Sequence, residues 1–156
     1  MSFEMNIVSN TPLTPLTSVD EVAIILLNQI GYFPKGYEPH TDAESIKESI
    51  PYRLFVDCFL ARMDKGWLVE DLATELDTTK ATVYRHINKL KGFDIVEDVA
   101  VETKEGKKKG YRIRYGDLSK AWNFTEAHVE MAMKSYRQTV DHLQSLAAKK
   151  HVKSKK

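Results

Sequence analysis

The chain has 156 residues, which is enough for one domain with its own core and an extension at either end. Hydrophobic residues make up 42% and charged residues 29%, as in ordinary globular proteins, and no apolar run is long enough to cross a bilayer. The single cysteine, Cys58, excludes an internal disulfide and a cysteine-cluster zinc site. Because the N-terminus lacks the pattern of a secretion signal, we expect a cytoplasmic protein with no membrane partner.

The formal net charge of +1 conceals an uneven distribution along the chain. Residues 1–50 carry two Lys/Arg against seven Asp/Glu, and residues 51–79 carry three against six. Residues 80–115 reverse this balance with ten Lys/Arg against five Asp/Glu, and the last eight residues add five lysines. Positive charge is therefore concentrated in residues 80–115 and in the C-terminal tail, which is typical of a surface that binds a polyanion. The lysine tail by itself is equally typical of a solvated segment.

Residues 1–50 predict a helical extension. Ser18 and Glu21 form a capping box, which predicts a helix that runs to about Gly31. One side of this helix would comprise Val22, Ile25, Leu26, Gln29 and Ile30. A second capping box begins at Thr41 and predicts a short helix that ends before Pro51.

The next segment predicts two consecutive helices. Pro51 suits the first turn of a helix that continues to Asp64, because the missing N–H of proline is not needed there. The buried face of this helix would be Leu54, Phe55, Cys58, Phe59 and Met63. After Trp67, which we expect on a short strand or turn, residues 68–76 form a second amphipathic helix.

A third helix is predicted over residues 79–91. It has one apolar row and an outer side of polar and cationic residues, which is the arrangement that a recognition helix needs. Thr79 is its plausible N-cap, and Val83, Ile87 and Leu90 form its inward apolar row. The candidate DNA contacts are the polar and cationic residues on its other sides: Thr79, Lys80, Thr82, Tyr84, Arg85, Asn88 and Lys89. His86 is expected at the edge of this helix, on DNA or in solvent.

A basic β-hairpin over residues 102–115 follows. Tyr111, Ile113 and Tyr115 alternate with cationic residues, which predicts a strand with one apolar and one cationic face. A glycine turn from Thr103 to Lys109 carries four lysines. The candidate phosphate or minor-groove contacts of this wing are Lys104, Lys107, Lys108, Lys109, Arg112 and Arg114.

Residues 51–116 resemble the ArsR/MarR-like winged-helix regulators of bacteria and archaea. The resemblance is carried by Leu72-Ala73, Thr79 to Ile87, Leu90 and Ile95-Val96-Glu97. It implies a winged helix-turn-helix fold, mainly α with a small β-hairpin, and a DNA-binding function. One departure is Asp94, where these families usually have glycine, although aspartate tolerates a left-handed conformation better than most residues.

The C-terminal segment, residues 117–148, predicts one long helix with Thr125 as its candidate N-cap, and residues 149–156 predict a basic disordered tail. Apolar residues recur along the helix at alternating spacings of four and three, which indicates about three heptads of a coiled-coil seam. These residues are Val129, Met133, Tyr136, Val140, Leu143 and Ala147. The helix either packs back on its own core or joins a homodimer that binds two half-sites about one helical turn apart.

The sequence gives little support for a metal site, a phosphate-binding loop or a catalytic site. The five histidines show no close-paired metal spacing, and His40 with Asp42 is the one local pair worth testing. No glycine-rich phosphate loop and no nucleophile–histidine arrangement can be identified, so we expect no metal, no cofactor and no enzymatic activity. The rings of Tyr32, Phe33 and Tyr37 either form a pocket for a small-molecule effector or cap the core.

The sequence therefore predicts a dimeric transcription regulator that binds double-stranded DNA in a sequence-specific way. Two other functions stay open at this point. A winged helix also binds structured RNA or the ribosome, which the lysine tail would suit, because the fold does not determine the partner. The acidic N-terminal half would instead suit a protein–protein module.

Overall fold

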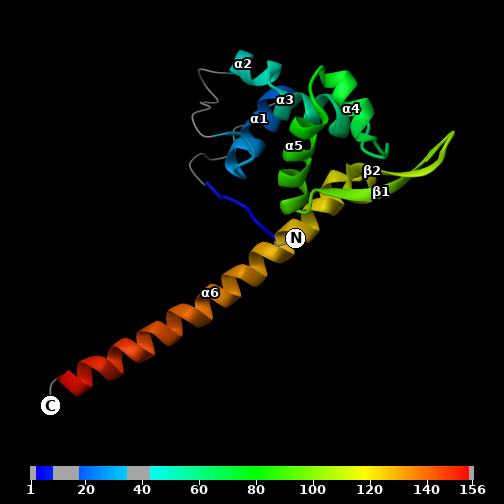
Figure 1. Ribbon diagram of the computed structural model, residues 1–156. Coiled ribbons are helices and arrows are strands. Elements are labelled where there is room, and N and C mark those ends of the chain that lie inside the picture. Colours follow the sequence, from blue (N-terminus) through cyan, green and yellow to red (C-terminus); the bar gives the residue numbers. More distant parts are fainter. Residues whose placement is uncertain (1–2, 9–17, 35–42, 155–156) are drawn as a thin grey trace.

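The computed structural model describes residues 3–8, 18–34 and 43–154. Most of the helices gather into a small domain, and two elements project from it: a β-hairpin and the long helix α6 (Leu118–Ser154) (Figure 1). Helix α6 leaves the domain as a single rod that ends at the C-terminus (Figure 1). The predicted fold class is confirmed, because the chain is mainly helical with a small antiparallel hairpin, N-terminal helices and a long C-terminal helix.

Helix α1 (Val19–Gln29) begins where the sequence indicates, since the Ser18 hydroxyl caps it by accepting from the backbone N–H of Glu21. Of the residues expected on one side of this helix, Ile30 is the one that is fully buried. The buried residues are Ala23, Ile24, Leu27 and Ile30, whereas Val22 is exposed. Because residues 22–27 form an unbroken apolar run, the periodicity does not determine which side faces the core. Helix α2 (Ala43–Glu48) follows; Thr41, in its predicted capping box, lies outside the described residues.

Pro51 lies in the first turn of α3 (Ile50–Tyr52), which continues into η1 (Arg53–Leu60). Element η1 is wound as a wide π-helix, in which the N–H of Ala61 donates to the main-chain oxygen of Val56 five residues earlier. The predicted residues Leu54, Phe55, Cys58 and Phe59 are buried, Met63 is partly buried, and Val56 is buried as well. The helix ends at Leu60, four residues before the predicted end.

Helices α4 (Val69–Leu76) and α5 (Lys80–Gly92) form the predicted helix-turn-helix. Between them the backbone of Asp77 adopts a left-handed conformation, with φ at 51°, which ends α4. Thr79 caps α5 as expected, because its side chain accepts from the N–H of Thr82 at 3.2 Å. The predicted inward row of Val83, Ile87 and Leu90 is fully buried.

The hairpin pairs β1 (Val96–Thr103) with β2 (Gly106–Ile113) in antiparallel register. Its turn comprises only the two residues between the strands, and Gly106 accepts the positive φ of 104° that closes it. The turn predicted to reach Lys109 is therefore wrong, because Lys107, Lys108 and Lys109 lie within β2.

Trp67 extends this small sheet, whereas Tyr115 lies outside it. Trp67 exchanges two backbone hydrogen bonds with Tyr111, at 2.8 and 2.9 Å, and so adds the expected short strand segment. Tyr111 and Ile113 are buried as predicted, but Tyr115 is not part of their face. It lies in the short helix η2 (Arg114–Gly116), with a positive φ of 61° and an exposed ring, because the strand ends at Ile113.

Helix α6 begins earlier and ends later than predicted. The Asp117 side chain caps it by accepting from the N–H of Lys120 at 3.0 Å, so the N-cap predicted at Thr125 is wrong. The helix continues through Ser154, so residues 149–154 of the tail are helical rather than disordered. Lysines near the end of a helix interact favourably with its dipole, which helps the extension. None of the helices in the described ranges is long and apolar enough to span a membrane.

Candidate nucleic-acid interface

The outer side of α5 presents most of the predicted contact residues to solvent. Thr79, Lys80, Tyr84, Arg85, Asn88 and Lys89 are exposed, and Thr82 is half-buried. With 100° per residue, Arg85 lies nearly opposite the buried row, so it projects furthest from the core. Within the described part of the chain, no ion pair engages Arg85. Its guanidinium is therefore available to a ligand without breaking an internal salt bridge.

The two threonines at the start of α5 are partly committed to the fold. Thr79 accepts from the backbone of Thr82 and also donates its hydroxyl to the Thr82 hydroxyl at 3.0 Å. These hydrogen bonds hold the first turn of the helix. Each hydroxyl oxygen keeps some capacity for a further hydrogen bond.

The positive charge of residues 80–115 is carried mainly by the helix. Residues 80–92 contain four Lys/Arg and no Asp/Glu, whereas residues 93–115 contain six Lys/Arg against five Asp/Glu. The hairpin is therefore close to neutral. We conclude that α5 is the main source of attraction for a polyanion on this side of the molecule.

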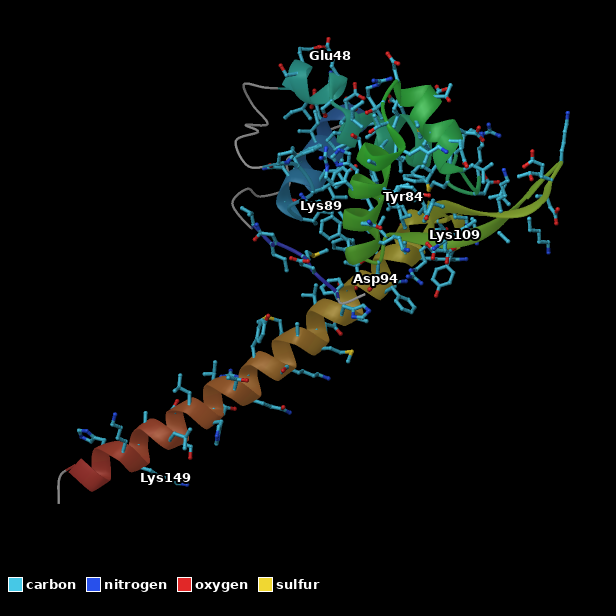
Figure 2. The ribbon with its side chains drawn as sticks, viewed as in Figure 1. Glu48, Tyr84, Lys89, Asp94, Lys109 and Lys149 are labelled. Carbon is cyan, nitrogen blue, oxygen red and sulfur yellow. The ribbon has the colours of Figure 1, made fainter. Side chains whose placement is uncertain are left out.

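A pair of tyrosines connects α5 to the hairpin. The ring of Tyr84 meets the ring of Tyr111 edge-on, with the centroids 6.4 Å apart. In Figure 2, Tyr84 lies on the side of α5 nearer the hairpin, and Lys109 lies on the hairpin beyond it. Because successive side chains of a strand point to opposite faces, Lys107 and Lys109 lie on the same face of β2 as Tyr111. These two lysines therefore extend the surface of α5 onto the wing.

Asp98 on β1 fixes two of the neighbouring lysines. Its carboxylate accepts from Lys91 of α5 at 2.8 Å and from Lys109 of β2 at 3.2 Å. Partial burial alone would raise the pKa of the Asp98 carboxyl, but the two lysine hydrogen bonds outweigh it and bring that pKa below its ordinary value. The carboxylate thus sets the position of the hairpin against α5. Sequence reasoning missed this role, because it depends on the register of the strands.

The remaining wing residues are placed differently. Lys108 and Arg112 lie on the opposite face of β2 from Lys107 and Lys109. The Nε of Arg112 donates to Glu97 at 2.9 Å, and Lys108 pairs with Glu105 at 3.1 Å. Lys104 is exposed in the two-residue turn at the tip of the hairpin. The structure therefore joins Lys107 and Lys109 to the α5 surface and separates Lys108 and Arg112 from it.

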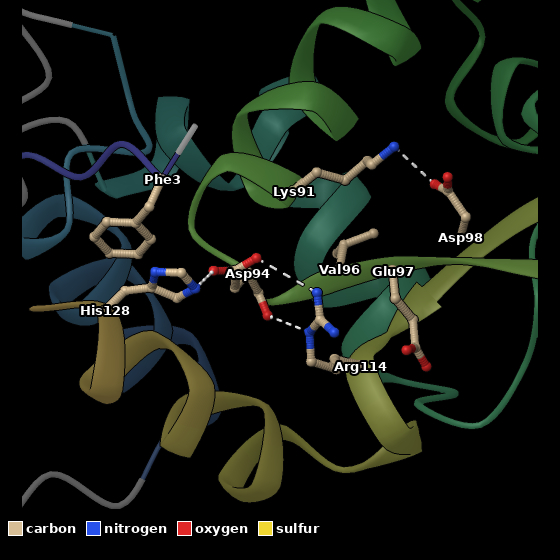
Figure 3. Close-up of a pocket in the computed structure, with 8 residues that line it drawn as sticks. All are labelled: Phe3, Lys91, Asp94, Val96, Glu97, Asp98, Arg114 and His128. Atoms are coloured by element: carbon tan, nitrogen blue, oxygen red, sulfur yellow. Dashed lines mark hydrogen bonds and ion pairs between the residues drawn. The ribbon is translucent and has the colours of Figure 1, made fainter. Parts of the chain in front are cut away.

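Arg114 belongs to a half-buried corner at the base of the wing. Asp94 there has a positive φ of 64°, the left-handed conformation expected at this position. Its carboxylate lies 3.4 Å from Nη2 of Arg114 and 2.7 Å from Nε2 of His128 on α6 (Figure 3). Phe3 stacks on the His128 ring at 4.8 Å. These four residues line part of a cavity of about 350 Å³ and join the wing, α6 and the N-terminal segment.

The N-terminal segment 3–8 also covers one end of α5. The N–H of Glu4 donates to the main-chain oxygen of Gly92 at 3.1 Å. Lys89 lies on the side of α5 nearer this segment (Figure 2), and desolvation lowers its pKa while Glu4 offsets part of that effect. The open part of the outer face is therefore the stretch that contains Arg85 and Asn88.

His86 and the aromatic residues near it pack into the core. His86, expected at the edge of α5 on DNA or in solvent, is half-buried, and its ring packs edge-on against Tyr32 with the centroids 6.4 Å apart. Burial, together with the charges of Arg85 and Lys89, lowers the pKa of His86 from 6.5 to about 4. Tyr32 and Phe33 are buried and cap the core, and Tyr37 lies outside the described residues.

The seam on α6 is exposed to solvent along most of its length. Met133, Tyr136, Val140 and Leu143 are between 52% and 65% exposed, Ala147 is exposed as well, and Val129 is half-buried. The alternative that this helix packs back on its own core is therefore excluded (Figure 1). An apolar row of this length in water is typical of a surface that is covered by a partner.

Among the described residues, no group of three or more His, Cys, Asp and Glu side chains could hold a metal ion. His40 and Asp42, the pair that the sequence singled out, lie outside these residues.

Comparison with known proteins identifies no family. No protein-family model matches the chain, and no curated protein matches it either. Among solved structures, the chain is similar to one described as a possible transcriptional regulator from Methanosarcina mazei Go1. The identity is 18% and the TM-score 0.42, with 90% of this chain and 98% of that chain covered. At this level the similarity adds nothing to the fold and site described above.

Proposed function

We propose that this protein is a transcription regulator that binds duplex DNA in a sequence-specific way, as a homodimer of the ArsR/MarR-like winged-helix type. The observation that supports it best is the continuous surface formed by the outer side of α5 and the facing lysines of β2. Helix α5 carries four cationic residues and no acidic one, and the contact between Tyr84 and Tyr111 holds the wing beside it.

In this proposal α5 enters the major groove, which admits a single α-helix. Arg85 is at the centre of the inserted face and reads a base edge, with Asn88 beside it. Thr79, Lys80, Thr82 and Lys89 hold the flanking backbone. Lys104, Lys107 and Lys109 meet phosphates or the minor groove, while Lys108, Arg112 and Arg114 add a more distant positive field.

Self-association is the second part of the proposal. An exposed seam on α6 would be removed from water by a second α6, at about 25 cal/mol per Å² of apolar surface. A two-fold dimer then presents two copies of α5 to two half-sites, one helical turn or a multiple of it apart.

The test is a filter-binding titration of the purified chain against duplex DNA and structured RNA over a range of salt concentrations. We expect duplex DNA to bind more tightly than RNA, with an affinity that falls steeply as salt rises. Tighter binding of RNA would favour an RNA- or ribosome-binding protein. No salt-dependent binding to either would favour a protein–protein module.

Two matched variants test the surface itself. Lys107→Ala with Lys109→Ala removes the lysines that face α5, and Lys108→Ala with Lys134→Ala removes the same charge from elsewhere. We expect the first pair to reduce the salt slope by up to about 0.9 per lost phosphate contact, and the second to reduce it less. Equal slopes for the two variants would show that the wing does not face the nucleic acid in this orientation.

A further inference from the structure

We propose that the partner of α6 is the α6 of a second copy, that the two helices are antiparallel, and that Glu126 of each closes the seam by pairing with Lys150 of the other. The orientation rests on the self-association proposed above and adds to it. It follows from the length of α6 and from the charges at the two ends of its exposed row.

The extended helix brings these two charges into the seam. Since α6 runs without a break from Leu118 to Ser154, the alternation of three and four residues continues past both ends of the apolar row. One step before Val129 it reaches Glu126, and one step after Ala147 it reaches Lys150. Both side chains are exposed, and neither forms an ion pair within the described residues. The seam therefore has an acidic residue at one end and a basic residue at the other.

In an antiparallel pair these charges match. The spacings along the row are symmetric about its centre, so they match when the second helix runs in the opposite direction. With Val140 opposite the partner's Tyr136, Met133 lies opposite the partner's Leu143. Val129 then lies opposite the partner's Ala147. The next layer outward puts Glu126 opposite the partner's Lys150. By two-fold symmetry this layer occurs twice, once at each end of the seam. Large side chains also face smaller ones, since Tyr136 meets valine and Val129 meets alanine.

A parallel pair has the opposite consequences. Each residue of the seam would face its own copy, so Glu126 would meet Glu126 and Lys150 would meet Lys150. The lysine-rich ends of the two helices, with five lysines each over residues 149–156, would also lie side by side. Like charges in direct opposition are unfavourable, and parallel dipoles add to the repulsion. Charge complementarity therefore favours the antiparallel arrangement.

The antiparallel arrangement also predicts the separation of the two domains. Ala121, where α6 is buried against its domain, lies about 25 Å along the helix from the centre of the seam at 1.5 Å per residue. The two anchoring points are then roughly 50 Å apart along the paired helices. Half-sites joined by such a dimer are expected to be more than one DNA turn apart, since one turn is about 34 Å.

Cysteine cross-linking tests the orientation on the full chain. Glu126→Cys and Lys150→Cys are prepared as separate variants, mixed under reducing conditions to allow exchange, and then oxidised. We expect a covalent dimer in the mixture, joined through residues 126 and 150 as shown by mass spectrometry of the linked peptides. Each variant alone should stay largely uncross-linked, because two copies of residue 126 would be about 36 Å apart. The unmodified chain serves as the control, since its one cysteine, Cys58, is buried.

The outcomes separate the orientation from the self-association. Efficient cross-linking of each single variant with itself, and no added product in the mixture, would overturn the antiparallel arrangement while leaving a dimer. A chain that is monomeric by light scattering and gives no cross-link would overturn the self-association as well.

Charge reversal gives a second measurement. We expect Glu126→Lys to raise the dimer Kd roughly 3- to 30-fold, because two attractive layers become repulsive. Adding Lys150→Glu to the same chain restores opposite charges in each antiparallel layer and should recover most of the loss. Failure of the double variant to recover affinity would contradict the proposed pairing.

Discussion

The buried hydroxyl of Thr125 on α6 donates a 2.7 Å hydrogen bond to the main-chain oxygen of Phe93, the residue that follows α5. Ala121, one turn earlier on α6, is fully buried in the same region. The base of α6 is thus attached directly to the C-terminal end of the proposed recognition helix. A dimer formed through α6 would for this reason fix the position of α5, since the link between them is a buried hydrogen bond rather than a loose connection.

Removing that hydrogen bond is expected to destabilise the domain. Thr125→Val keeps the size of the side chain but leaves the Phe93 oxygen buried without this donor, which costs about 1–3 kcal/mol of the free energy of unfolding. The matched control is Thr139→Val, because the Thr139 hydroxyl also donates to a backbone oxygen but is exposed on α6. Urea unfolding measures both variants. A loss for Thr125→Val no larger than that for Thr139→Val would refute the attachment.

The stability of the domain is expected to fall in mild acid because of His86. Its pKa in the folded protein is about 4, against 6.5 ordinarily, so between these values the unfolded chain binds a proton that the folded chain does not. Stability is therefore complete above about pH 6.5 and decreases as the pH falls toward 4. The effect at pH 5 is roughly 1–2 kcal/mol.

The measurement compares urea unfolding at pH 7 and pH 5 for the unmodified chain and for His86→Gln. Glutamine does not titrate, so the decrease between the two pH values should be smaller in the variant. The same decrease in both proteins would show that His86 is not the group responsible.

The helix-turn-helix and its wing could be predicted from the sequence because their signals are local. The cap at Thr79, the spacing of Val83, Ile87 and Leu90, and the left-handed Asp94 each depend on residues a few positions apart. Local patterns of this kind fix the start of a helix and its inward face without reference to the rest of the chain.

The features that the sequence did not reveal depend on contacts between distant segments. The two lysines held by Asp98 come together only through the register of the hairpin and its packing on α5. His86 is on a polar stretch of α5, and its burial results from Tyr32 more than fifty residues earlier. The sequence predicts too late a start for α6 because Thr125 is a good capping residue, whereas in the structure its hydroxyl donates a tertiary hydrogen bond to Phe93.

Arg85 is expected to provide sequence recognition rather than general attraction. Arg85→Ala should weaken binding to a preferred duplex by roughly 1–3 kcal/mol, with a smaller loss on random duplex DNA and an unchanged fold. Arg137→Ala is the matched control, since Arg137 is an exposed arginine on α6. Fluorescence anisotropy measures both duplexes, and circular dichroism checks the fold. Equal losses on the two duplexes would make Arg85 a phosphate contact.

A charge in the centre of the α6 seam is expected to prevent dimerisation. Val140→Glu would place a carboxylate beside apolar neighbours of the second copy, which is costly. We expect a folded monomer with sharply reduced affinity for a two-half-site duplex, measured by light scattering and anisotropy. Gln138→Glu adds the same charge on the opposite side of the helix and should stay dimeric. If Val140→Glu remains as dimeric as the unmodified chain, the seam is not the interface.

The central proposal is tested most directly by selecting bound sequences from a random duplex DNA library. We expect an enriched inverted repeat, because a two-fold dimer presents the same recognition helix to each half-site. Arg85→Ala, carried through the same selection, should lose preference at one position in each half. A library that shows no enrichment after repeated rounds, with binding that does not depend on sequence, would contradict the assignment of α5 as a recognition helix.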